Sequence, residues 1–178
     1  MDHKTLHLTD RGLTSLVGLV PDDITEVYCT YNNLTSLEGL PDSVIVLECG
    51  YNPLLTSLKG LSENITRLYC TDCSLTSLEG LPEGIEDVWC YRNKLSSLEG
   101  LPKSVENVYC SANQLTTLEG LPEGVKNVYC SNNKLTSLKG VPKHTFVEYR
   151  NNPIWWQHIR EKHTELPSNG CYKITEYL

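Results

Sequence analysis

Hydrophobic residues recur along this chain at a nearly fixed spacing of about twenty residues. The unit is clearest between Leu115 and Lys134, LTTLEGLPEGVKNVYCSNNK, and the same phrase returns at Leu95 and Leu135. Its strand half follows the order apolar-x-x-apolar-x-Cys-x-x-Asn-x-Leu. A short period of this kind predicts a solenoid, in which each unit buries its apolar face against its neighbours.

The copies align on one column of cysteines. Its members are Cys29, Cys49, Cys70, Cys90, Cys110 and Cys130, separated by 20, 21, 20, 20 and 20 residues. Leu8 takes this position in a first copy and Tyr149 in a last one, so we expect about eight repeats over residues 5–154. Two single-residue irregularities, one near Val20 and one in 52–55, fall outside the strand cores and predict small loop bulges.

The repeat resembles the leucine-rich repeat, L-x-x-L-x-L-x-x-N-x-L, with Cys at the third apolar site. Its short period and the Leu-Pro before the strands, as at Leu81-Pro82 and Leu121-Pro122, resemble the bacterial-effector subclass. Similar short repeats occur in proteins of large DNA viruses and protists. The resemblance implies an α/β solenoid with a parallel β-sheet on its concave face, irregular or 3₁₀ structure on its convex side, and partner binding through the concave face.

Alternation within each unit predicts which side chains are buried. In a strand of about five residues, 107–111, Val108 and Cys110 point inward while Tyr109 points outward. The chain then turns at Asn113, whose amide is expected to satisfy backbone groups of adjacent turns. The same role is predicted for Asn32, Asn52, Asn93, Asn133 and Asn152.

The two ends differ from the middle, as a solenoid requires where it would otherwise expose its core. We expect residues 1–12 to form an N-terminal cap with a first strand, and residues 154–178 a C-terminal cap. An amphipathic helix is predicted over 154–166, with Ile154, Trp155, Ile159 and Leu166 on its apolar stripe. Partial alternation in 171–178 predicts one more short strand. The whole chain, 1–178, is then a single domain.

Charge and cysteine content narrow the function. A net charge of −7 excludes a general nucleic-acid-binding surface. Neither a secretory signal nor a membrane-spanning run is recognisable, so we expect a cytoplasmic protein, in its own cell or in a host cell, with buried reduced thiols. Cys70 and Cys73 form a C-x-x-C, but both are explained by repeat positions, so no metal or cofactor is expected.

Catalysis is not indicated. The five histidines lie in or near the caps, and none stands beside a plausible nucleophile. Effectors with such repeats sometimes carry a ubiquitin-ligase domain with a nucleophilic Cys, but only about 25 residues follow the last repeat. We therefore expect a protein that is not an enzyme.

The outward strand positions form the surface of most unusual composition. We predict that it binds a partner through Tyr28, Glu48, Tyr69, Trp89, Tyr109 and Tyr129, with Arg67, Asp87, Tyr91 and Arg92 beside them. Aromatic residues also stabilise neighbouring strands, which alone can explain any single ring. Together they suit a protein interface, because Tyr and Trp are enriched there. Carbohydrate binding on the ring faces and self-association through this face or a sheet edge are the alternatives.

Overall fold

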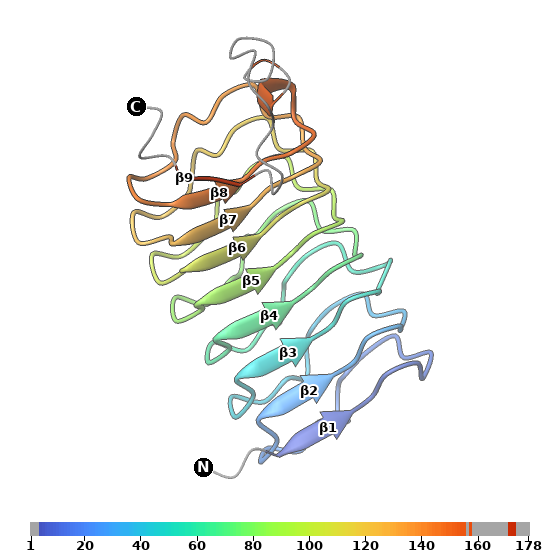
Figure 1. Cartoon of the computed structure of the whole chain (residues 1–178). Coiled ribbons are helices and arrows are strands. Elements are labelled where there is room, and N and C mark those ends of the chain that lie inside the picture. The colour runs from blue at the N-terminus through green and yellow to red at the C-terminus, as the bar shows by residue number, and fades with distance from the viewer. Residues whose placement is uncertain (1–3, 156, 158–170, 174–178) are drawn as a thin grey trace.

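The computed structural model describes residues 4–155, 157 and 171–173, and its strands stack along one side of a solenoid (Figure 1). In these described residues, nine short strands form a single sheet in chain order. They are β1 Thr5–His7, β2 Glu26–Tyr28, β3 Val46–Glu48, β4 Arg67–Tyr69, β5 Asp87–Trp89, β6 Asn107–Tyr109, β7 Asn127–Tyr129, β8 Phe146–Glu148 and β9 Cys171–Lys173.

Strands β1 to β8 are parallel and in register, as the repeat predicts. The last strand differs. β9 confirms the short strand predicted in the tail, but it pairs antiparallel with β8, with Phe146 opposite Lys173. The sheet is therefore parallel through the repeats and closes with one antiparallel strand.

The strands are shorter than the five residues predicted. β6 ends at Tyr109, yet its pairing with the next turn continues, because the Cys110 N–H donates to the carbonyl of Tyr129 at 2.8 Å. The Ala112 N–H likewise donates to the carbonyl of Ser131 at 2.8 Å. Ala112 has a φ of 55°, in the left-handed region, and this bend ends the regular strand while the inter-turn bonds persist.

The predicted inward positions form the core. Val108, Cys110, Leu115 and Leu118 are all 0% exposed, whereas Tyr109 is half-buried. The cysteine column lies inside the sheet with them, and seven thiols are free and buried: Cys29, Cys49, Cys70, Cys73, Cys90, Cys110 and Cys130. Burial raises the pKa of the thiol to about 12 at Cys29 and Cys90. These sulfurs therefore behave as small apolar core groups.

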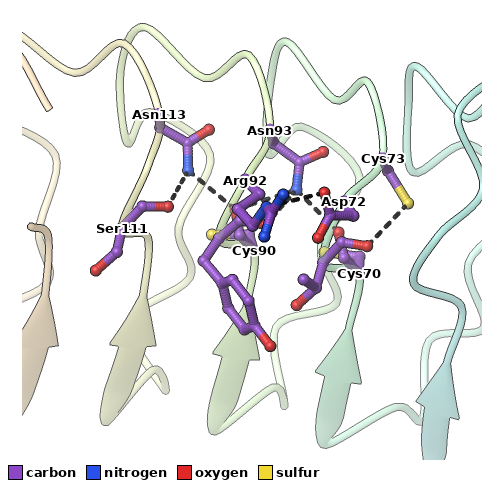
Figure 2. A network of polar contacts seen from close by, with 10 residues as sticks. Cys70, Asp72, Cys73, Cys90, Arg92, Asn93, Ser111 and Asn113 are labelled. Atoms are coloured by element: carbon purple, nitrogen blue, oxygen red, sulfur yellow. Dashed lines mark hydrogen bonds and ion pairs between the residues drawn. The ribbon is translucent and has the colours of Figure 1, made fainter. Parts of the chain in front are cut away.

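The repeat asparagines join successive turns, as predicted (Figure 2). The side-chain amide of Asn113 donates to the carbonyls of Cys90 and Cys110, both at 3.0 Å. Its Oδ1 accepts the N–H of Leu95 at 3.0 Å. Bonds of the same kind are made by Asn32, Asn52, Asn93, Asn133 and Asn152. Each amide thus pairs buried backbone groups that the bend would otherwise leave unsatisfied.

One turn replaces this asparagine by Cys73, and the structure compensates for it. The Cys73 sulfur lies 3.5 Å from the carbonyl of Cys49 and supplies only the donor part of the amide's role. The N–H of Leu55, which is the equivalent of Leu95 two turns earlier in the stack, instead donates to the carbonyl of Asn52 at 3.0 Å. That local turn encloses Pro53 and Leu54, at the insertion seen in the sequence. The insertion and the substitution therefore form one structural adaptation.

The return segments are built from single turns. In the segment after β6, the Leu121 N–H donates to the carbonyl of Leu118 at 3.4 Å, and the Val125 N–H to that of Pro122 at 3.1 Å. Such bonds span three residues, as in 3₁₀ structure, but in the described residues they do not continue into a 3₁₀ helix. Twenty residues leave too little chain for more.

The predicted C-terminal helix begins at Pro153 and is described at 153–155 and 157. Ile154 and Trp155 are 8% and 6% exposed, in agreement with the predicted apolar stripe. The Trp155 ring meets the Tyr149 ring edge-on, with centroids 5.7 Å apart. Ile159, Leu166 and the rest of the predicted helix lie outside the described residues.

The compensation at Cys73 predicts unequal costs for similar substitutions. Asn113→Ala removes three buried hydrogen bonds and should lower the free energy of unfolding by about 2–4 kcal/mol. Cys73→Ala removes only a weak sulfur donor and should cost less than about 1.5 kcal/mol. Urea unfolding of both variants measures the difference, and equal losses would contradict the assigned role of the amide.

The buried thiols predict a loss of stability at alkaline pH. A thiol is neutral when protonated, so a raised pKa means that the folded chain keeps protons which the unfolded chain loses above pH 9.0. Stability should be unaffected by this group below pH 9.0 and should fall as pH rises toward about 12. Urea unfolding between pH 7 and 11 tests this. Cys90→Ala should remove up to about 1.4 kcal/mol per pH unit from the slope, and an unchanged slope would refute it.

Candidate functional site

The third position of each strand carries the predicted column of outward side chains. Four consecutive rings, Tyr69, Trp89, Tyr109 and Tyr129, stack with centroids 4.1, 4.7 and 4.8 Å apart and interplanar angles of 13°, 5° and 4°. We call these four rings the aromatic ladder. Parallel strands in register lie about 4.8 Å apart, which places the rings at this stacking distance.

Stacking changes what the aromatic ladder presents to solvent. The sequence suggested an exposed aromatic band, but the four side chains are half-buried because each ring face lies against the next ring. Ring edges and polar tips are left at the surface. Burial raises the pKa of the Tyr69 and Tyr109 phenols above 10.0, so both hydroxyls stay protonated and available for hydrogen bonding.

A row of polar side chains runs beside the aromatic ladder, at the first strand position. The amide of Asn127 donates to Oδ1 of Asn107 at 2.7 Å, and the amide of Asn107 donates to Oδ1 of Asp87 at 2.6 Å. The Nε of Arg67 lies 3.7 Å from the other oxygen of Asp87. These side chains are thereby held in fixed orientations next to the rings, on β4 to β7.

The column is interrupted at Glu48, which separates Tyr28 from the aromatic ladder. Tyr28 instead stacks on His7, with centroids 5.1 Å apart and an interplanar angle of 29°. At the other end, Tyr129 meets Phe146 at 5.7 Å and a tilted angle of 55°. The column therefore contains two separate stacks with a carboxylate between them.

Tyr91 and Arg92 lie beyond the end of β5, away from the regular strands. Tyr91 is exposed, and Arg92 extends toward Asp72, with its Nε 3.0 Å from Oδ1 (Figure 2). The predicted residues therefore fall into three groups: the aromatic ladder with Arg67 and Asp87, the Tyr28 and Glu48 positions, and this turn.

A further pair of stacked rings, more exposed than the aromatic ladder, was not among the predicted binding residues. Tyr31 and Tyr51 lie 4.3 Å apart at an interplanar angle of 7°, and they are 55% and 39% exposed. Both have φ of 56°, which is uncommon for a bulky residue. The signal was present in the sequence, since both residues follow a column cysteine by two positions.

The described residues offer little for catalysis or metal binding. Among them, no group of three or more His, Cys, Asp and Glu side chains is placed to hold a metal ion. Burial raises the pKa of Cys73 to about 11 and that of Cys70 well above 9.0, whereas reactive cysteines have lowered values. No helix in the described ranges is both long and apolar enough to cross a membrane.

Comparison with known proteins identifies the fold. No protein-family model and no curated protein matches the sequence. Among solved structures, YopM, a leucine-rich effector from Yersinia pestis, aligns at 23% identity with a TM-score of 0.61, covering 83% of this chain and 49% of that one. YopM from Yersinia enterocolitica WA-314 aligns at 24% identity with a TM-score of 0.59, covering 76% and 35%. A Shigella effector leucine-rich repeat domain aligns at 27% identity with a TM-score of 0.56, covering 84% and 59%.

This chain spans between about a third and three fifths of the length of those three structures. The likeness covers the stacked parallel strands, and it agrees with the repeat seen in the sequence. The chain therefore has the leucine-rich repeat fold, and its solenoid is like those of bacterial effector proteins.

Proposed function

We propose that this protein is a non-catalytic module that binds a partner protein on the open face of its sheet. Trp89, with Tyr69, Tyr109 and Tyr129, would form the centre of the contact. The observation that carries the proposal is the aromatic ladder, because its rings are already stacked at 4.1–4.8 Å. Such rings lose little conformational freedom when a partner docks.

The surroundings of the aromatic ladder also suit a protein interface. Hot spots are enriched in Trp and Tyr, and polar groups usually surround them. Here Asp87, Asn107 and Asn127 are held beside the rings by hydrogen bonds of 2.6 and 2.7 Å. A partner can therefore meet apolar edges and fixed polar groups on one surface.

The stacking favours a protein partner over a carbohydrate. Sugars stack on exposed aromatic faces, but the faces of Trp89 and Tyr109 are covered by neighbouring rings. Self-association remains the other alternative, and light scattering at rising concentration would reveal it. The net charge of −7 favours a neutral or basic partner.

The same proposal includes the compartment. Free, buried thiols at seven described positions suit a reducing environment. We place the protein in the cytoplasm, either of its own cell or of a host cell into which it is delivered. The effector-like solenoid supports protein partners in both settings.

Loss of the central rings should weaken binding strongly. In Trp89→Ala/Tyr109→Ala, affinity for partners captured by the wild-type chain and identified by mass spectrometry should fall by at least about 30-fold, equivalent to about 2 kcal/mol. Leu54→Ala is the control, since Leu54 is 53% exposed and lies outside the strands. Far-UV circular dichroism verifies folding. A folded double variant that kept every partner would refute the proposal.

A further inference from the structure

We propose that the interruption of the column at Glu48 receives an arginine side chain of the partner, inserted between the Tyr28 and Tyr69 rings and paired with the Glu48 carboxylate. This inference rests on the proposed function and specifies the chemistry of the partner. The register of the strands, the uncovered ring faces and the charge at Glu48 support it.

The register sets the distance between the two rings. Glu48 on β3 lies opposite Tyr28 on β2 and Tyr69 on β4, so the two tyrosines are two strands apart, about 9.6 Å. Elsewhere in the column, Trp89 fills the same interval between Tyr69 and Tyr109, at 4.1 and 4.7 Å from them. A planar group above Glu48 would therefore stack on both flanking rings at similar distances.

The two ring faces toward Glu48 are not covered by other rings. Tyr28 stacks on His7 and Tyr69 stacks on Trp89, both on the sides away from Glu48. Within the described residues, no ring contact joins Tyr28 to Tyr69. A glutamate side chain is shorter than a tyrosine, so its carboxylate lies below the outer parts of the rings. The arrangement has two aromatic walls and an acidic floor.

The charge of Glu48 is unbalanced in the described part of the chain. No ion pair or hydrogen bond holds its carboxylate there, although the side chain is half-buried. The other carboxylate of the column, Glu148, accepts a bond from Ser131 at 2.7 Å and lies 3.7 Å from Arg150. Arg67, on the adjacent strand β4, is directed to Asp87. A cation from outside would complete the site.

Electrostatics at Tyr69 agree with this placement. Burial is the main cause that raises the pKa of the Tyr69 phenol. The positive charge of Arg67 opposes the rise, and Asp87, Tyr28 and Glu48 add to it. Tyr28 and Glu48 are therefore within electrostatic reach of Tyr69. The negative potential of two aromatic faces and one carboxylate favours a positively charged occupant.

Arginine fits better than lysine or a neutral aromatic group. Its guanidinium is planar, stacks on aromatic faces and can donate two parallel bonds to a carboxylate. An ammonium is compact and strongly hydrated, so it gains less from two flanking rings. A neutral ring would cover Glu48 without supplying a counter-charge.

Three short peptides test the site directly. Acetyl-Gly-Gly-Arg-Gly-Gly-amide, and its lysine and citrulline counterparts, would be titrated into the protein while the Tyr28 and Tyr69 ring protons are followed by NMR. The arginine peptide should bind at about millimolar Kd, at least about fivefold more tightly than either counterpart. Citrulline keeps the plane without the charge, and lysine keeps the charge without the plane. Equal binding of all three would overturn the proposal.

Variants of the column carboxylates provide matched controls. Glu48→Gln should weaken binding of the arginine peptide at least about fivefold, while Glu148→Gln should leave it unchanged. Glu48→Tyr should complete the stack, keep or raise the thermal midpoint and abolish peptide binding. Unchanged binding in folded Glu48→Gln or Glu48→Tyr would overturn the site.

The captured partner separates the two proposals. Loss of the partner in both Glu48→Tyr and Trp89→Ala/Tyr109→Ala supports the arginine site and the binding surface together. If Glu48→Tyr keeps the partner and the double variant loses it, the arginine site is wrong and the aromatic ladder stands. If neither variant loses it, both proposals fail.

Discussion

The side-chain amide of the repeat asparagine holds its own turn of the solenoid to the turn before it. The Asn113 amide donates to the carbonyls of Cys90, Cys110 and Ser111 and accepts the N–H of Leu95, in a buried bend where water cannot replace these bonds. These bonds fix the spacing and register of successive turns. Leucines, valines and cysteines then meet their equivalents in the next turn, and a single unit has no comparable core of its own.

The same register determines the outer surface. Because β1 to β8 pair residue for residue, any residue type repeated at one strand position becomes a continuous row. Rings form a stack, and the carboxamides of Asn107 and Asn127 form a hydrogen-bonded chain ending at Asp87. The surface proposed for binding is thus produced by the geometry that builds the core, with few loops involved.

Much of this fold could be predicted from the sequence. The twenty-residue spacing located the strands, the cysteine column located the interior, and Asn113 and its equivalents were assigned their bonding role. Three features depended on three-dimensional detail. They are the antiparallel pairing of β9, the local turn in which the Leu55 N–H bonds to Asn52, and the left-handed backbone at Ala112. Residue spacing carries no information about strand direction or about these hydrogen bonds.

The candidate surface was less predictable. The outward column was correctly placed, but spacing could not tell that rings would cover one another's faces, because that depends on side-chain rotamers. Tyr31 and Tyr51 share a repeat position that carries Asp72, Arg92, Ala112 and Asn132 in later turns, so the sequence shows no row of aromatic residues there. The spacing predicts Glu48 as one member of the outward row, whereas in the structure it separates two ring stacks.

Two interruptions coincide at one level of the stack. Between β3 and β4 the amide joint is replaced by the Cys73 sulfur, with one long contact to the Cys49 carbonyl, and ring stacking is absent at Glu48. In the later turns, the side-chain amides of Asn93, Asn113, Asn133 and Asn152 each bond to the preceding turn. Under a pulling force applied at the two ends, the contact between the β3 and β4 turns would therefore break first. The solenoid would separate into an N-terminal part with strands β1 to β3 and a C-terminal part that begins at β4.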